Sequence, residues 1–95
     1  MGMFDSLIAD DGSDWQTKAF KCGLDTYRIG DAIPSPRPIY PIYQVKVLGG
    51  GRGGEFTYSH ATVLHGFLAS VPDSRDDRLP LLDYSGGWLS AGKDA

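Results

Sequence analysis

Apolar and polar residues alternate in two runs near the middle of the chain. Residues 42–47, IYQVKV, place Tyr, Val and Val at every second position, and residues 56–59, FTYS, do the same with Phe and Tyr. A period of two is typical of a half-buried strand. The residues GGGRGG (49–54) lie between the two runs. The pattern therefore predicts a β-hairpin with a mobile, glycine-rich tip.

An almost continuous apolar run, ATVLHGFLASV at residues 61–71, follows the second of these strands and contains Gly66. A short apolar run bounded by turn residues is consistent with a buried strand. We therefore expect the core to include four side chains of this central region, which are Val45, Val47, Val63 and Phe67.

Shorter segments predict the elements before the hairpin. MFDSLIA (3–9) reads as a strand that ends at a turn cluster, DDGSD. WQTKAF (15–20) fits either a helix behind Asp14 as N-cap or a strand, and its Trp, Thr and Phe favour the strand. LDTYRIGDAIP (24–34) is expected to be extended and to turn at Gly30-Asp31.

Proline and polar residues mark the connections. PSPRPIYP (34–41) holds four prolines and is expected to be extended and unpaired, because proline fixes φ and lacks an amide hydrogen. It is either a stiff connector, which its position in mid-domain favours, or a ligand for an aromatic groove. PDSRDDRLP (72–80) predicts a polar loop, and LLDYSGGWL (81–89) predicts a last strand with a glycine kink.

These elements amount to five to six short strands. They predict a mainly β fold, a small antiparallel sheet curled into a barrel or a two-layer sandwich. The 95 residues include 13 glycines and six prolines, which favour short elements joined by turns. We expect one small domain at residues 1–90 and a frayed tail at 91–95.

Charge and cysteine content exclude several classes of protein. The net charge of −3 is incompatible with a broadly basic nucleic-acid surface, although a local basic patch stays open. The single cysteine, Cys22, excludes an intramolecular disulfide. An apolar run of about 18 residues, which a membrane-spanning helix needs, is missing from the sequence.

Candidate chemistry is sparse. His60, His65 and Cys22 do not have the spacing of a metal site, and the glycine loop lacks the Lys-Ser/Thr pair of a phosphate-binding loop. The acidic clusters at 10–14 and 73–77 are expected to be solvated turns, the second paired with Arg75 and Arg78. We therefore predict no catalytic residue, no metal site and no cofactor, and expect a protein that is not an enzyme.

The segment WQTKAFKCGLDTYRIGD (15–31) combines aromatic and basic residues. Small β-barrels bind single-stranded nucleic acid with aromatic rings that lie beside cations. Trp15, Phe20 and Tyr27 are candidates for that role, but a domain this small also needs them in its core. That core role is favoured. The binding residues that we predict are Gln16, Lys18, Lys21 and Arg28, together with Arg52 at the hairpin tip.

Three short motifs in the first third of the chain carry a resemblance. MGMFD at residues 1–5, QTK at 16–18 and LDTY at 24–27 resemble a group of short, uncharacterised proteins encoded by bacteriophages and prophages. Some of those proteins have a C-x-x-C pair before QTK, as in a zinc knuckle. This chain has IADDGSD (8–14) there, so zinc is not implied.

The resemblance implies a phage-encoded accessory protein without defining an activity. We expect it to bind a host or virion protein, in the cytoplasm of an infected bacterium or in the virion. A nucleic-acid-binding small β-barrel and a virion or assembly component are the alternatives. A membrane partner is not expected, and homo-oligomerisation stays open.

Overall fold

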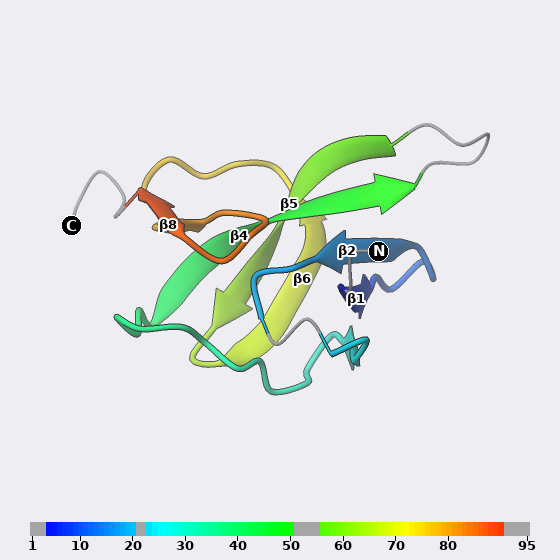
Figure 1. Ribbon diagram of the computed structural model, residues 1–95, viewed down its shortest axis with the longest axis horizontal. Coiled ribbons are helices and arrows are strands. Elements are labelled where there is room, and N and C mark those ends of the chain that lie inside the picture. Colours follow the sequence, from blue (N-terminus) through cyan, green and yellow to red (C-terminus); the bar gives the residue numbers. More distant parts are fainter. Residues whose placement is uncertain (1–3, 21–22, 51–55, 91–95) are drawn as a thin grey trace.

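The computed structural model describes residues 4–20, 23–50 and 56–90, and within these ranges the chain forms eight strands and no helix (Figure 1). The strands are β1 (Asp5–Ile8), β2 (Asp14–Thr17), β3 (Thr26–Arg28), β4 (Ile42–Gly50), β5 (Phe56–Leu64), β6 (Phe67–Asp73), β7 (Leu81–Leu82) and β8 (Trp88–Ser90). The prediction of a mainly β fold with a mostly antiparallel sheet is confirmed. Of the strand predicted at residues 15–20, residues 15–17 are confirmed as part of β2, which ends at Thr17.

The strands form one sheet in the order β3-β1-β2-β4-β5-β6, with β7 and β8 branching from β4. The predicted hairpin is the longest pairing, in which β4 and β5 match over nine residues each. Its tip, residues 51–55 with Arg52, lies outside the described residues. One edge of β4 is shared, because β7 pairs with residues 44–45 and β2 with residues 48–49.

The sheet curls until the chain after β3 meets β6 at the opposite edge. The turn predicted at Gly30-Asp31 is present, and Gly30 has a φ of 94°. Beyond it, the Gly30 amide donates to the Leu68 carbonyl at 2.8 Å and the Leu68 amide donates to the Asp31 carbonyl at 2.9 Å. Because β3 and β6 do not pair with each other, the sheet stays open.

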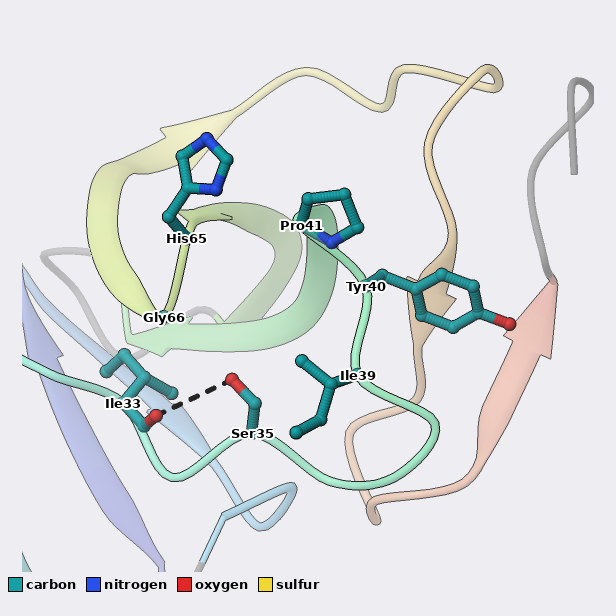
Figure 2. Close-up of a pocket in the computed structure, with 7 residues that line it drawn as sticks. All are labelled: Ile33, Ser35, Ile39, Tyr40, Pro41, His65 and Gly66. Carbon is teal, nitrogen blue, oxygen red and sulfur yellow. Dashed lines mark hydrogen bonds between the residues drawn. The ribbon is translucent and has the colours of Figure 1, made fainter.

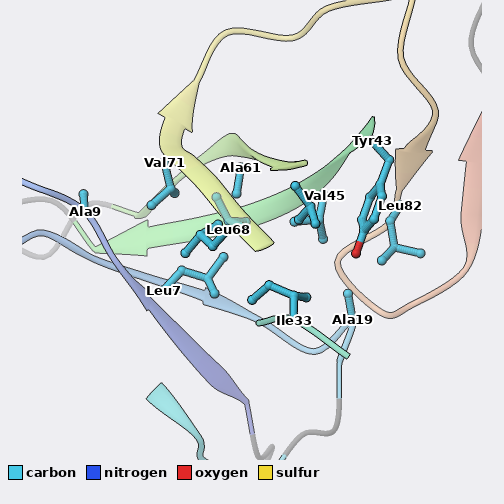
Figure 3. Packing of buried hydrophobic residues seen from close by; sticks show 12 residues of the cluster. Leu7, Ala9, Ala19, Ile33, Tyr43, Val45, Ala61, Leu68, Val71 and Leu82 are labelled. Carbon is cyan, nitrogen blue, oxygen red and sulfur yellow. The ribbon is translucent and has the colours of Figure 1, made fainter. Parts of the chain in front are cut away.

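The core lies on the concave side of this sheet (Figure 3). Val45, Val47 and Val63 are fully buried, as predicted. Trp15, Phe20 and Tyr27 pack against the core without being fully buried, which agrees with their favoured role. The other buried apolar residues come from five of the strands and from the segments that follow β1, β2 and β3: Leu7, Ala9, Ala19, Ile33, Tyr43, Ala61, Leu68, Val71 and Leu82.

The prediction that Phe67 belongs to the core is wrong, because the apolar run 61–71 is a hairpin and not one strand. His65 and Gly66 have φ values of 50° and 84° and form a two-residue turn between β5 and β6. The turn places Phe67 opposite Leu64 on the outer face, where 53% of Phe67 is exposed. Leu68 takes the core position instead.

Two further predictions are corrected. Residues 81–89 do not form one kinked strand, since Asp83 to Gly87 make a turn between β7 and β8. The β4 strand is not half-buried at Gln44, which is 2% exposed on the outer face. There the side chain accepts hydrogen bonds from the Asp76 amide at 2.8 Å and Arg75 Nη1 at 3.1 Å, and donates to the Ser74 carbonyl at 2.9 Å.

The proline-rich segment 34–41 joins Ile33 to β4 without forming a strand of its own. Trp88 Nε1 donates to the Arg37 carbonyl at 3.1 Å, and the Ser35 and Tyr43 hydroxyls are 2.9 Å apart. Tyr40 also packs edge-on against Trp88. The segment is therefore held against the end of the sheet, as a connector would be.

Truncation of the first two side chains of β6, Phe67 and Leu68, should distinguish a surface position from a core position. We expect Leu68→Ala to lower the free energy of unfolding by about 2–5 kcal/mol, because it leaves a cavity in the core. Phe67→Ala should cost less than about 1 kcal/mol, since the ring is largely in solvent. Urea unfolding followed by tryptophan fluorescence measures both, and equal losses would contradict the turn at His65–Gly66.

Removing the Gln44 side chain should release the loop 74–80 from the outer face. Gln44→Ala leaves partly buried polar groups of the loop without their partner, each at a cost of about 1–3 kcal/mol. We expect a total loss of about 3 kcal/mol and a melting temperature lower by more than about 10 °C. Gln16→Ala, the same change at a half-buried position of β2, is the control and should lower stability by less than about 1 kcal/mol. A Gln44 variant as stable as this control would show that solvent replaces the network at no cost.

Candidate interaction surfaces

The motif residues that are buried have structural roles. Asp5 is fully buried, and its Oδ1 accepts hydrogen bonds from the Gly23 and Asp25 amides, each at 3.0 Å. The Ser6 amide donates to the Asp25 carbonyl at 2.8 Å. The end of the MGMFD motif and the start of the LDTY motif are therefore fastened together by hydrogen bonds, as part of the fold.

Thr17, the middle residue of QTK, is also fully buried. Its hydroxyl lies 3.3 Å from the Lys46 carbonyl and 3.4 Å from the Tyr84 carbonyl, and it accepts from the Ala19 amide at 3.2 Å. These atoms lie where the pairing partner along one edge of β4 changes from β7 to β2. The Thr17 side chain supplies a donor there in addition to the backbone amides of the two strands.

The predicted binding residues do not form one cluster. Gln16 lies on β2 and Arg28 on β3, and β1 separates the two strands, with Ser6 opposite Gln16 and Ile8 opposite Arg28. Lys18 follows β2, and its amide donates to the Tyr84 carbonyl at 2.9 Å. Lys21 and Arg52 lie outside the described residues.

Gln16 and Lys18 instead adjoin a pair of tyrosines that the sequence pattern did not single out. Tyr58 on β5, Leu48 on β4 and Gln16 on β2 lie in one row across the outer face. Tyr58 is 59% exposed, and Tyr84 packs edge-on against it with ring centroids 6.3 Å apart. Lys46 Nζ lies 4.6 Å from the centre of the Tyr58 ring. We call this group the tyrosine surface; it comprises Gln16, Lys18, Lys46, Tyr58 and Tyr84.

A second feature is apolar and lies where the β5–β6 turn meets the connector. Ile42, Leu64 and Phe67 stand opposite one another on β4, β5 and β6, and are 37%, 41% and 53% exposed. Ile39 in the connector is 65% exposed. We call these four residues the apolar end.

A pocket of about 430 Å³ opens beside the apolar end (Figure 2). One wall is formed by Ile33 and by the connector residues Ser35, Ile39, Tyr40 and Pro41, and the other is the turn with His65 and Gly66. The His65 amide donates to the Pro41 carbonyl at 2.7 Å and joins the two walls. The lining is mostly apolar, with a hydroxyl and an imidazole among its polar groups. Such a pocket suits the side chain of a partner.

The second acidic cluster is only partly the solvated turn that was expected. Arg78 and Asp76 form an exposed pair with Nη2 and Oδ2 3.1 Å apart, and hydrogen bonds from Arg78 lower the pKa of Asp76. Asp73, however, turns toward the sheet, where its Oδ2 accepts from the Thr62 hydroxyl at 2.6 Å and from the Ser70 hydroxyl. That carboxylate holds β5 and β6 together.

His60 stands opposite Asp73 in the β5–β6 pairing, between the acidic loop and the tyrosine surface. Partial burial lowers the pKa of His60, and the charges of Arg75 and Lys46 lower it further against the opposing effect of Asp73. The imidazole is therefore expected to be neutral at neutral pH. In the described part of the chain, His60 and the carboxylates do not gather into a group of three metal-ligating side chains.

None of the helices that a membrane span would require is present in the ranges 4–20, 23–50 and 56–90. Comparison with protein-family models, with curated proteins and with solved structures finds no match to this chain.

Proposed function

We propose that this protein is a non-enzymatic accessory protein of a bacteriophage that binds a host or virion protein through the apolar end. The observation that supports the proposal is the row Ile42, Leu64 and Phe67 on three adjacent strands, all exposed, beside a pocket. Contiguous exposed apolar side chains on a soluble domain mark a site of interaction. The phage origin is supported by the resemblance of the three N-terminal motifs.

The partner's chemistry follows from the pocket and the row together. A segment that places one aliphatic or aromatic side chain in the pocket could lay a second one against Leu64 and Phe67. Burial of these groups gives the apolar centre, and the polar groups of Ser35 and His65 lie at the same site. Action in the cytoplasm of an infected cell, or in the virion, fits a partner of either origin.

The test changes two exposed side chains of the apolar end and leaves the core residues as they are. Tagged protein is used to capture partners from lysate of an infected host and from purified particles. We expect the double variant Leu64→Ser, Phe67→Ser to lose proteins that wild type retains. Leu89→Ser is the matched control, since Leu89 is 57% exposed on β8, and it should retain them.

The recovered partner is then titrated by calorimetry at several temperatures. Burial of apolar surface requires a negative heat-capacity change on binding, and the double variant should bind at least tenfold more weakly. Retention of the same partners by the double variant, or a heat-capacity change near zero, argues against the apolar end.

A further inference from the structure

The tyrosine surface has a composition different from the apolar end and stands on different observations. Tyr58 lies on the outer face of β5 opposite Leu48 of β4, beyond the end of the β5–β6 pairing, and the residue is 59% exposed. Tyr58 has the residue type that is enriched at binding surfaces, because its ring is apolar and its hydroxyl is polar. It is not an element of the core, because Ser59, Ala61 and Val63 occupy the inward positions of β5.

The surroundings of Tyr58 are held in place by other parts of the fold. Lys46 stands on the adjacent strand, paired with His60, and its ammonium lies at the Tyr58 ring. Tyr84 belongs to the β7–β8 turn. Its backbone is held in place because its carbonyl accepts hydrogen bonds from the Lys18 amide and the Thr17 hydroxyl. The two rings and the Lys46 cation are therefore arranged before any ligand arrives.

Each group has a role that a single-stranded nucleic acid can use. A flat aromatic ring in solvent stacks on a base of any type, and a neighbouring ammonium attracts the phosphate that follows the base. The amide of Gln16, in the same row as Tyr58, offers both a donor and acceptors to a base edge. By contrast, the apolar end is formed by uncharged side chains and offers nothing to a polyanion.

We propose that the tyrosine surface binds single-stranded nucleic acid without sequence preference, by stacking on Tyr58 with Lys46 near the phosphates. This goes beyond the proposed protein partner, and the two surfaces are independent. Because the chain as a whole carries a charge of −3, the affinity is expected to be modest, with Kd on the order of 10⁻⁵ M at low salt.

The experiment follows fluorescence anisotropy of a fluorescein-labelled oligothymidylate as protein is added, at several NaCl concentrations. Tyr58→Ala should weaken binding at least about tenfold, whereas Tyr58→Phe, which keeps the ring, should bind like wild type. Lys46→Gln should reduce the slope of log K against log salt by about 0.7, the contribution of one phosphate contact on a single strand.

Two controls make the outcome decisive. Phe67→Ala, at the apolar end, should leave oligonucleotide binding unchanged, and thermal melts show whether each variant is folded. Polyglutamate is added as a competitor: if it displaces the oligonucleotide as well as unlabelled oligothymidylate does, the surface binds acidic protein and the proposal is overturned. Absence of binding at 50 mM NaCl, or a folded Tyr58→Ala that binds like wild type, overturns it too.

Discussion

The division of one edge of β4 between two partners is the constraint on which the rest of the structure depends. A strand has one hydrogen-bonding edge on each side, and β5 takes one of them along the whole of β4. On the other edge, β7 runs parallel to the first half and β2 runs antiparallel to the second. Where the two partners meet, backbone groups lack a regular partner, and buried polar groups must be paired. Thr17 resolves this with a side-chain hydroxyl, which joins β2, β4 and the β7–β8 turn at one point.

The same strand determines where the two proposed interaction surfaces lie. Ile42 at the start of β4 belongs to the apolar end, and Lys46, four residues later, belongs to the tyrosine surface. Between them Gln44 is covered by the loop 74–80 and is unavailable to a partner. The outer face is therefore divided into an apolar part and a cationic, aromatic part by a buried polar network.

The sequence pattern predicts the β class and the central hairpin, because alternation in β4 reports directly on its two faces. It fails in β5, where the aromatic positions 56 and 58 and the apolar positions 61 and 63 have opposite phase. Pairing with β4 decides the conflict, since Val45 and Tyr43 place Ala61 and Val63 inside and leave Tyr58 outside. The exposed tyrosine could be identified only once that register was known.

The exposure of Phe67 and the burial of Asp5 could not be predicted from the sequence pattern. His-Gly is a less familiar hairpin turn than Asn-Gly, and the run around it is apolar enough to read as one strand. The burial of Asp5 has no signal in the sequence, because the amides that it pairs with belong to a distant segment. Thr17 differs, since alternation along a strand already places it on the core side, opposite to Gln16 and Lys18, and it is fully buried. Of the predicted site, Gln16 and Lys18 join the tyrosine surface, while Arg28 stands apart on β3.

The way the sheet ends has a consequence for how this small protein behaves at high concentration. Unpaired strand edges are templates for ordered aggregation, and a long β6 at the margin of the sheet would be such a template. Here the first part of β6 is covered by residues 30–33, and Pro72 near its end has no amide hydrogen to offer another strand. At high concentration, therefore, β6 exposes few backbone groups that could form hydrogen bonds with a strand of another copy. Contacts between copies at β6 would then be made by side chains, and a mutation that changes those side chains does not create an edge for ordered aggregation.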